Sequence, residues 1–598
     1  TSREVLGLLG EQVLTLGPLP PDESAALFLT RASAAHRAFQ PTDDDTAAIA
    51  ELVALLDHLP LAIELAATRI RVLPPRKLLA RMSDRFRLLV APRGRHARHS
   101  TLRATLDWSW DLLNPVEQDT LAQLSVFEGG FTLEAAEEVV DLSAHDDAPW
   151  PLDVVQALVD RSLLRQGESG RLGMLVSVQA YATEKLQAMG GVDPLYRRHG
   201  EHFAALGAPN FITSLNTHGG TDRRRMLRQD QENLCVGLKR MLSLPDPTTA
   251  LYLLRAAWGA HRLSGSVADI PTLGRRLLDH PGMTPNLRGH VLHILFEYER
   301  VSGMRRGIEA MQQEAYTLFQ QTRDLRMLGI VTASRGLLCS RTGRVEEALA
   351  LYREALGYFE ESGDTDPMAV TLGNYGVLLD DMEQWDEGMA CQQRALAIHR
   401  TNGNRRNEAI TLNNIGINLF QRNRLTEARQ IYREAMAIHQ ALGNRRSEGI
   451  VCGNLGSMAL LQGDLETARR DLHTALHIHR SVGNRRSESL MLRELGHLLQ
   501  TTGHSTQARQ HYESALTIAQ EINNTRYIGA THGFLGSLEV MVGNHTAARD
   551  HLTVAIAHLE QVQASGATAR ARSHLAILYA ARGELDEALP CARTARDI

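Results

Sequence analysis

Several features common in secreted proteins and membrane proteins are absent from this 598-residue sequence. It has five cysteines, and no two of them form a C-x-x-C pair. An odd number at wide spacing argues against a disulfide framework or a zinc site, and is consistent with a reducing cytoplasm. No apolar run approaches the length of a membrane span. The N-terminus has neither an initiator Met nor signal-peptide character. We therefore expect a cytoplasmic chain cut from something longer.

The motifs of nucleotide chemistry and catalysis are missing as well. No G-x-x-x-x-G-K-[ST] loop occurs, and an ATPase of the corresponding class cannot hold the β- and γ-phosphates without it. The sequence has no paired nucleophile and base, no metal-ligand spacing and no Rossmann glycine pattern. We predict that the chain as given is not an enzyme, contains no catalytic or metal-binding residue and has no cofactor of its own.

The composition favours a helical fold and gives no indication of a charged polymer as binding partner. Aromatic residues make up 5% of the sequence, and this scarcity beside abundant Ala, Leu and Arg favours helical repeats over a β-sandwich. Basic and acidic residues number 64 and 69, for a formal net charge of -5. This near balance gives no overall attraction to nucleic acid or to an anionic membrane.

A repeat of 40 residues dominates the second half of the chain. Small residues recur in three columns that stay in register over seven periods. The first column is Gly336, Gly376, Gly416, Gly456, Gly496, Gly536 and Ala576. The second is Ala348, Gly388, Ala428, Ala468, Ala508, Ala548 and Ala588, and the third is Ala355, Ala395, Ala435, Ala475, Ala515, Ala555 and Ala595. Only Gly or Ala lets two helices approach closely without overpacking, so the columns predict packed helical hairpins.

This placement of small residues resembles the tetratricopeptide repeat, and the 40-residue period resembles the longer-helix subtype of kinesin light chains. The resemblance implies hairpins stacked into a right-handed superhelix, with the first helix of each pair lining a concave face. Glycines recur in the turn inside the hairpin, where a helix C-cap needs a positive φ. These are Gly343, Gly463, Gly503, Gly543 and Gly583.

The candidate peptide-binding residues lie in two further columns. Asn374, Asn414 and Asn454 stand two residues before the Gly column, with Asn413 beside them. In the family this column often holds an Asn that bonds the backbone of an extended peptide; the alternative is that the Asn residues satisfy a neighbouring helix. The loops between hairpins carry the pairs Arg405 and Arg406, Arg445 and Arg446, and Arg485 and Arg486.

The Arg pairs admit two interpretations. They form a rim that attracts an acidic partner, or they are solvated or paired with Glu408, Glu448 and Glu488. His399, His439 and His479 recur once per repeat, too far apart to chelate one ion, and we expect them to be surface or packing residues.

The N-terminal third resembles the part of a signal-transduction ATPase with numerous domains (STAND class, NB-ARC-like) that follows its phosphate-binding loop. Thr1-Ser2-Arg3 resembles the sensor strand end whose Arg reads the γ-phosphate. Leu59-Pro60-Leu61 resembles the Gly-x-Pro motif whose Pro lies against adenine, although His58 stands where Gly is usual. The resemblance implies a nucleotide-binding role for Arg3, Leu59, Pro60 and Leu61, with ADP or ATP held by the intact parent.

The next block resembles the winged-helix module of bacterial members of that class. It contains Thr101–Leu113 with Trp108 and Trp110, expected to be core and contact residues, and continues to Leu164. The block lacks a dense basic recognition helix, so we expect it to contact the nucleotide domain of its own chain instead of DNA. At Val176–Ala182 the charged positions usual in the family are missing.

The predicted fold class is all-α: a tetratricopeptide α-solenoid preceded by a winged-helix domain and a small helical domain. The expected boundaries are residues 1–19 for the end of a nucleotide-binding domain, 20–95 for the helical domain, 96–190 for the winged helix, 191–325 for an irregular helical spacer with degenerate repeats, and 326–598 for about seven repeats, the last incomplete.

The functional hypothesis is the sensor and regulatory portion of a nucleotide-controlled signalling switch that binds a protein or peptide in its repeat groove and can oligomerise on activation. The alternatives are a plain scaffold without nucleotide switching and a transcriptional regulator. No membrane partner is expected, and DNA only through an output domain outside this sequence.

Overall fold

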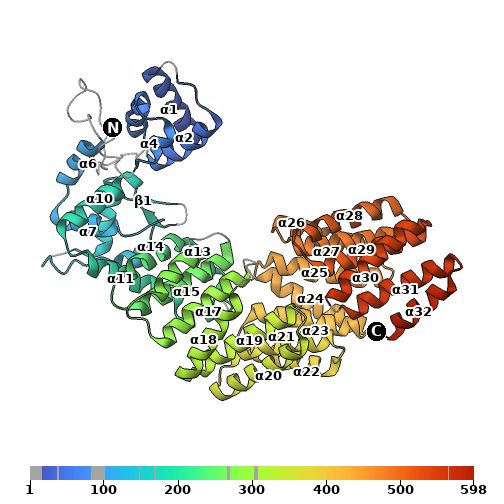
Figure 1. Ribbon diagram of the computed structural model, residues 1–598. Helices are drawn as coiled ribbons and strands as arrows, with labels where there is room; N and C mark the ends of the chain where they lie inside the picture. Colours follow the sequence, from blue (N-terminus) through green and yellow to red (C-terminus); the bar gives the residue numbers. More distant parts are fainter. Residues whose placement is uncertain are drawn as a thin grey trace. The chain divides into compact units, whose positions relative to one another are not determined.

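The computed structural model describes residues 17–36, 39–82, 102–146, 149–167, 170–217, 219–264, 270–301, 307–562 and 564–597 (Figure 1). Helices dominate these residues, and the strands β1 (Arg165–Gln166) and β2 (Leu172–Gly173) form one antiparallel pair. The all-α prediction is confirmed. The chain divides into two compact units: Thr1–Ile212 with Arg223–Leu287, and Thr213–Asp222 with Arg288–Ile598.

The first unit begins with a small group of helices. They are α1 (Pro21–Ala35), α2 (Asp43–Leu55), α3 (Pro60–Ala67), the 3-10 helix η1 (Thr68–Arg71) and α4 (Pro75–Leu79). Thr42 and Asp45 cap α2 reciprocally, and Pro60 occupies the first position of α3, where its missing N–H costs nothing. Phe28, Leu52 and Ile63 are fully or almost fully buried between these helices. The group therefore has a core of its own.

A second group of elements follows in the same unit. It consists of α6 (Leu102–Asp111), α7 (Pro115–Leu124), α8 (Leu133–Val139), α9 (Pro151–Asp160), the β1–β2 pair and α10 (Val176–Met189). Phe131, which lies before α8, forms a bridge with Leu172 of β2. Trp110 is buried and meets Tyr181 of α10 edge to face at 5.9 Å. Trp108 is 54% exposed, so the expectation of a core position for it was wrong.

The remaining helices before the repeats are α11 (Val192–Ala204), η4 (Ala205–Gly207), α12 (Pro209–Ser214), α13 (Gly220–Gln229), α14 (Gln231–Met241), α15 (Pro247–Ser264) and α16 (Ile270–Leu278). Asn233 of α14 is fully buried and joins this group to the preceding one. Its amide accepts a hydrogen bond from the Glu128 backbone N–H and donates one to the Gly130 carbonyl, at 2.7 and 2.9 Å. Arg171 reinforces the contact through an ion pair with Asp230 at 2.6 Å.

The second unit is a stack of helical hairpins. Its helices are α17 (Pro285–Val301), α18 (Ile308–Thr322), α19 (Leu325–Arg341), α20 (Val345–Ser362), α21 (Thr365–Asp381), α22 (Trp385–Thr401), α23 (Arg405–Gln421), α24 (Leu425–Ala441), α25 (Arg445–Leu461), α26 (Leu465–Ser481), α27 (Arg485–Thr501), α28 (Ser505–Glu521), α29 (Thr525–Val542), α30 (His545–Gln561), α31 (Ser565–Ala581) and α32 (Leu585–Asp597). Each odd-numbered helix from α19 onward, here called a first helix, packs against the second helix that follows it.

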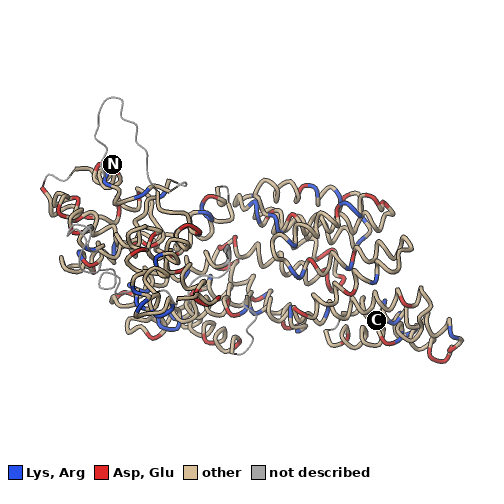
Figure 2. The backbone as a smooth tube through the Cα atoms, turned by 90° about the horizontal axis from the view of Figure 1, so that it is seen from above, with Lys and Arg blue, Asp and Glu red and all other residues tan. Residues whose placement is uncertain are grey.

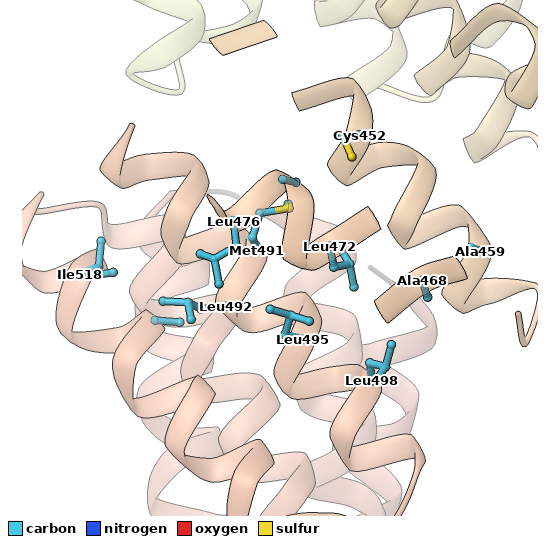
Figure 3. Close-up of a cluster of buried hydrophobic side chains, with 12 residues drawn as sticks. Cys452, Ala459, Ala468, Leu472, Leu476, Met491, Leu492, Leu495, Leu498 and Ile518 are labelled. Atoms are coloured by element: carbon cyan, nitrogen blue, oxygen red, sulfur yellow. The ribbon is translucent and has the colours of Figure 1, made fainter. Parts of the chain in front are cut away.

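The Gly column works as predicted, through one contact per hairpin. A Cβ on Gly416 would lie 2.5 Å from the Tyr432 ring, and one on Gly496 would lie 2.6 Å from the Tyr512 ring. In other hairpins, such as the one that contains Gly456, the side chain opposite the Gly is a Leu instead of a Tyr. Figure 3 shows the buried cluster formed by α25 to α28, to which Leu472, the partner of Gly456, and Met491 belong. The absent side chain thus makes room for a large one sixteen residues later.

The turns inside the hairpins also follow the prediction. Gly343, Gly463, Gly503, Gly543 and Gly583 all have φ between 75° and 82°. In the two hairpins that lack this Gly, Glu383 and Asn423 adopt the same left-handed conformation, with φ of 61° and 59°. The turn geometry therefore persists where the residue best suited to it is missing.

The recurring His residues are packing residues inside the hairpins. His399, His439 and His479 are at most 2% exposed. A Cβ on Gly449 would meet the His479 ring at 2.8 Å, as one on Gly329 would meet Phe359 at 2.5 Å. Burial lowers the pKa of all three imidazoles, that of His439 to about 4. They are therefore neutral core groups at physiological pH.

Candidate functional site

The first helices lie on the inner side of the curved stack. Neighbouring first helices contact one another from α19 to α31, and they approach more closely than neighbouring second helices do. Each first helix presents positions six and two residues before the Gly column and one residue after it, which lie on a single helix face. In α21 these positions hold Val370, Asn374 and Val377, and the two Val side chains are 44% and 38% exposed. Ile410 continues the strip in α23.

The four predicted Asn residues fall into two classes. Asn454 of α25 donates its side-chain N–H to Oδ1 of Asn413 in α23 at 2.9 Å, so this pair links neighbouring helices. Asn374 and Asn414 are half-buried on the inner face, and neither amide has a hydrogen-bond partner within the described residues. The alternative that these residues satisfy a neighbouring helix therefore holds for Asn413 and Asn454. Asn374 and Asn414 keep hydrogen-bond donors and acceptors that a ligand could use.

The rim Arg residues are mostly engaged with the protein. Arg405, Arg445 and Arg485 each form an ion pair with the Glu three residues later, at 2.6, 2.8 and 2.9 Å. Those carboxylates, Glu408, Glu448 and Glu488, are buried. A buried carboxylate needs a charged partner, so these three Arg residues stabilise the loops between hairpins.

The second Arg of each pair differs from the first. Arg406 and Arg446 act electrostatically on the buried His439 and His479 and contribute to lowering their pKa. Arg486 lies over the Tyr527 ring, 5.4 Å from its centroid. Figure 2 shows basic and acidic residues interspersed along the hairpins, without a block of one sign. The rim is therefore less cationic than its Arg pairs suggest.

The inner face changes character from α27 onward. Arg493 of α27 lies 5.3 Å from the Phe534 ring centroid and 5.9 Å from that of Tyr527, both in α29. It forms an ion pair with its neighbour Glu494 at 3.3 Å. Its Nε atom is buried and has no hydrogen-bond partner.

Two further cations approach the same place from neighbouring helices. Partial burial lowers the pKa of Arg570 in α31, and Arg493 and then Arg526 contribute in the same direction, opposed by Glu494. Arg526 also acts on Asp381, at the end of α21, whose pKa burial raises. We call Arg493, Arg526 and Arg570 the arginine cluster. Sequence reasoning missed it because its members occupy three different columns of the repeat.

The nucleotide-side motifs are only partly described. Arg3 lies outside the described residues. Leu59, Pro60 and Leu61 form the start of α3, with Pro60 at its first position. His58 has φ of 53°, a left-handed conformation that Gly adopts more freely than other residues.

The residue before His58 makes the contact that ties this corner to α10. The Asp57 carboxylate accepts hydrogen bonds from the backbone N–H of Val176 and Ser177, at 2.6 and 2.9 Å, and from the Ser177 hydroxyl at 2.7 Å. It caps the N-terminus of α10, where Leu175 offers no capping side chain. The structure thus brings together the Leu59-Pro60-Leu61 motif and the Val176–Ala182 stretch, two segments that the sequence related only through a family resemblance.

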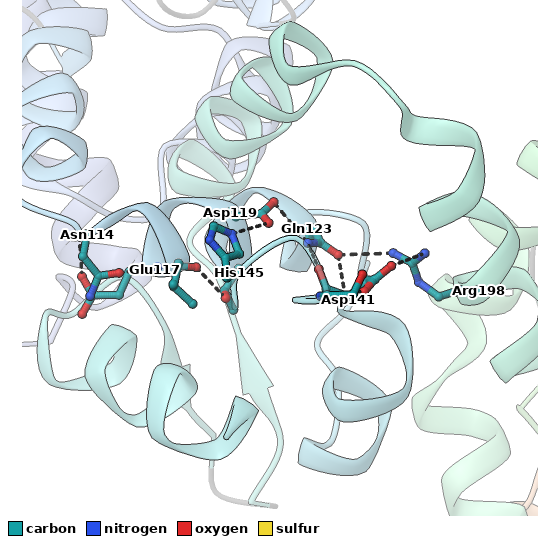
Figure 4. A network of polar contacts seen from close by, with 10 residues as sticks. Asn114, Glu117, Asp119, Gln123, Asp141, His145 and Arg198 are labelled. Atoms are coloured by element: carbon teal, nitrogen blue, oxygen red, sulfur yellow. Dashed lines mark hydrogen bonds and ion pairs between the residues drawn. The ribbon is translucent and has the colours of Figure 1, made fainter. Parts of the chain in front are cut away.

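A polar network connects α7 with α11 (Figure 4). His145 contacts Asp119 at 3.1 Å, and Gln123 exchanges hydrogen bonds with the Asp141 backbone at 2.7 and 2.8 Å. Arg198 bonds the Val139 carbonyl at 2.8 Å and the Asp141 carboxylate at 3.4 Å. These contacts hold the loop after α8 in place.

Metal ligation and membrane insertion are two further possibilities for the part of the chain that the structure describes. No group of three or more His, Cys, Asp or Glu residues there has the geometry to hold a metal ion. Across the described ranges no helix has the length and apolarity to cross a membrane.

Comparison with known proteins identifies the repeat. The sequence model of the tetratricopeptide repeat matches residues 367–441 and 450–521, and a second model of the same repeat matches residues 569–594. The second half of the chain is a tetratricopeptide-repeat solenoid.

Curated relatives extend the comparison beyond the repeats. The chain is 37% identical over 284 residues to a putative HTH-type transcriptional regulator of Mycobacterium tuberculosis, covering 46% of this chain and 29% of the relative. It is 36% identical over 224 residues to an uncharacterized protein of the same organism, covering 37% and 56%. It is 24% identical over 381 residues to the regulatory protein AfsR of Streptomyces coelicolor, covering 58% and 37%. The match therefore spans between under a third and just over half of these relatives.

Solved structures with similar helical folds include a STAND protein with a tetratricopeptide-repeat sensor from Pyrococcus horikoshii. It is 14% identical, with a TM-score of 0.36, over 97% of this chain and 72% of that one. A Rap protein complexed with Competence and Sporulation Factor is 14% identical, with a TM-score of 0.44, over 63% of this chain and 97% of that one.

Proposed function

We propose that this chain is the sensor portion of a nucleotide-controlled regulatory protein and that its repeat groove binds an extended peptide or a flexible protein segment. The observation that carries the proposal is the pair of open amides on the inner face, Asn374 and Asn414, one repeat apart. An extended backbone exposes N–H and C=O groups whose burial without partners is costly. Amides at regular spacing meet that need whatever the peptide's side chains are. Val370, Val377 and Ile410 supply apolar contacts around them.

The nucleotide-controlled part of the proposal rests on the first unit. The order of α7, the bridging Phe131, α8, α9 and the β1–β2 pair supports the proposal of a winged helix. Asp57 joins this module to the corner that holds Leu59 and Pro60. In the parent protein, ADP or ATP would lie against that corner, and a change of nucleotide would break or remake the Asp57 contact. Arg3 would read the γ-phosphate there.

This chain by itself is proposed to be cytoplasmic and without catalytic activity. Its phosphate-binding loop is missing from the sequence, so nucleotide turnover would belong to the parent. For the groove to control that parent, the ligand must bind its open and closed states with different affinity. Oligomerisation would follow opening.

Transcriptional regulation is the second candidate function. One relative is named a putative HTH-type transcriptional regulator and another a regulatory protein. The formal charge of -5 and the lack of a basic recognition helix argue against direct DNA binding by this chain. DNA contact would come from an output domain outside it. The remaining alternative is a plain scaffold that does not sense nucleotide. It would bind its partner through the same groove, and the Asp57 contact would then be structural only.

The test of the groove is a capture experiment on the full chain, followed by calorimetry with the best partner. Asn374→Ala and Asn414→Ala should each weaken binding by about 0.5–1.5 kcal/mol, the net worth of a hydrogen bond. The control is Gln430→Ala, because Gln430 is an exposed amide on α24, a second helix. If the double variant stays helical and binds as tightly as the wild type, the groove assignment is wrong and the partner binds another face.

A further inference from the structure

The arginine cluster is an unusual arrangement for the inside of a groove. Its three cations come from α27, α29 and α31, and Glu494 is the carboxylate paired with one of them. Arg526 and Arg570 are exposed on the inner side, and neither makes a hydrogen bond or ion pair within the described residues. Glu494 offsets one of the three guanidinium charges, so the cluster keeps an excess of positive charge that an anion in the groove would balance.

The aromatic side chains fix the geometry of the cluster. Arg493 is held over Phe534 and Tyr527, and Arg486 reaches the same Tyr527 ring from the rim. Guanidinium groups held against rings lose little further freedom when they bind a planar carboxylate with two parallel hydrogen bonds. The buried, unpartnered Nε of Arg493 offers one such donor.

We propose that the arginine cluster binds a run of acidic side chains, Asp or Glu, in the peptide that occupies the groove. The inference rests on the proposed function and adds a chemical class to its ligand. The two halves of the inner face then have separate roles. The half formed by α21, α23 and α25 pairs with the backbone of any extended segment, and the half formed by α27, α29 and α31 selects for negative charge.

The experiment uses the full chain and four defined probes measured by fluorescence anisotropy. Blocked hexaglutamate, acetylated at one end and amidated at the other, carries side-chain carboxylates alone. Hexaglutamine with a free C-terminus carries a terminal carboxylate alone, and hexaglutamine blocked at both ends carries neither. A ten-nucleotide oligothymidylate offers phosphates and bases, which also bind to Arg and aromatic side chains. We expect blocked hexaglutamate to bind at least tenfold more tightly than the other three probes, and to weaken as salt rises.

The variant Arg526→Gln/Arg570→Gln should weaken binding of blocked hexaglutamate at least tenfold and leave the helix content unchanged, because neither side chain pairs within the described residues. The matched control is Arg469→Gln/Arg549→Gln, which removes the same charge from exposed positions of α26 and α30 and should change binding less than twofold.

Equal loss in both variants would reduce the effect to net charge and overturn the inference. Tighter binding of the oligothymidylate or of hexaglutamine with a free C-terminus would overturn it in favour of that ligand. Absence of hexaglutamate binding would also overturn it. The groove proposal stands or falls separately: a natural partner that is lost with Asn374→Ala/Asn414→Ala but retained with Arg526→Gln/Arg570→Gln would keep the groove and exclude the acidic run.

Discussion

Gly496 provides a sharp test of how the repeats hold together. It lies inside α27, where Ala has a helix propensity better than that of Gly by about 0.5–1 kcal/mol. A Cβ at this position, however, would lie 2.6 Å from the ring of Tyr512, which is fully buried. The ring cannot swing away freely, because the Tyr512 hydroxyl donates a hydrogen bond to Oε1 of Gln500 at 2.7 Å. Overpacking of this kind costs about 1–3 kcal/mol.

The two terms predict that Gly496→Ala destabilises α27 and α28 by about 0.5–2 kcal/mol. The matched control is Gly357→Ala in α20, where no heavy atom lies within 4 Å of the added Cβ. This control should stabilise its helix by about 0.5–1 kcal/mol. Because repeat arrays do not unfold as a single two-state unit, local stability is measured by native-state hydrogen exchange on peptides from each hairpin.

The same substitution made in the Tyr512→Ala variant separates the steric clash with the ring from any other effect of Gly496→Ala. In Tyr512→Ala the ring is gone, and Gly496→Ala should then stabilise as the control does. The double variant would have Ala at both positions, as the last hairpin has with Ala576 and Ala592. If Gly496→Ala slows exchange in α27 of the wild type, or destabilises equally with and without the Tyr512 ring, close packing is not the reason for the Gly column.

Two further substitutions test the buried polar groups. Because burial lowers the folded-state pKa of His439 to about 4, below the unfolded value of about 6.5, its contribution to stability is complete above pH 6.5 and is lost as the pH falls toward 4. His439→Leu introduces the residue that Leu559 supplies in the same column, and should therefore reduce the loss of local stability between pH 7 and pH 5 by on the order of 1–2 kcal/mol. The measurement is native-state hydrogen exchange in α24 of both proteins, corrected for the pH dependence of the intrinsic exchange rate; an unchanged loss would contradict this. Asp57→Ala should destabilise the first unit by about 1–3 kcal/mol, because two α10 amides lose their acceptor, and should raise hydrogen exchange at Val176 and Ser177 while exchange in α25 stays constant; unaltered exchange at both amides would refute the capping role.

The repeats were predictable from sequence because their packing is local and periodic. The Gly column, the left-handed turns and the small residues between helices each depend on contacts within one hairpin, so one correct inference transfers to every repeat. The columns also explain an exception. Gly388 stands where the other hairpins have Ala because the Asp380 carboxylate would lie 2.0 Å from a Cβ there. The sequence shows that exception but contains no local signal for its cause.

Sequence predicted the candidate site only for residues that recur with the 40-residue period of the repeat. The 40-residue spacing was enough to find Asn374 and Asn414. It could not show that the Asn454 amide donates a hydrogen bond to Asn413. The Arg pairs were found in the same way, but the first Arg of each pair is neutralised by a buried Glu three positions later. Asp57 escaped notice because its partners, Val176 and Ser177, are about 120 residues away.

The arginine cluster shows why departures from the period are informative. Arg493, Arg526 and Arg570 stand three, ten and six residues before the Gly column of their own hairpins, so no duplication of a repeat unit placed them together. Structural residues in a solenoid recur because every hairpin has the same packing requirement. Arg493 packs on aromatic rings, but Arg526 and Arg570 make no hydrogen bond or ion pair within the described residues and add their charge to that of Arg493. Packing of the stack does not call for these two residues, whereas the anionic ligand proposed above would.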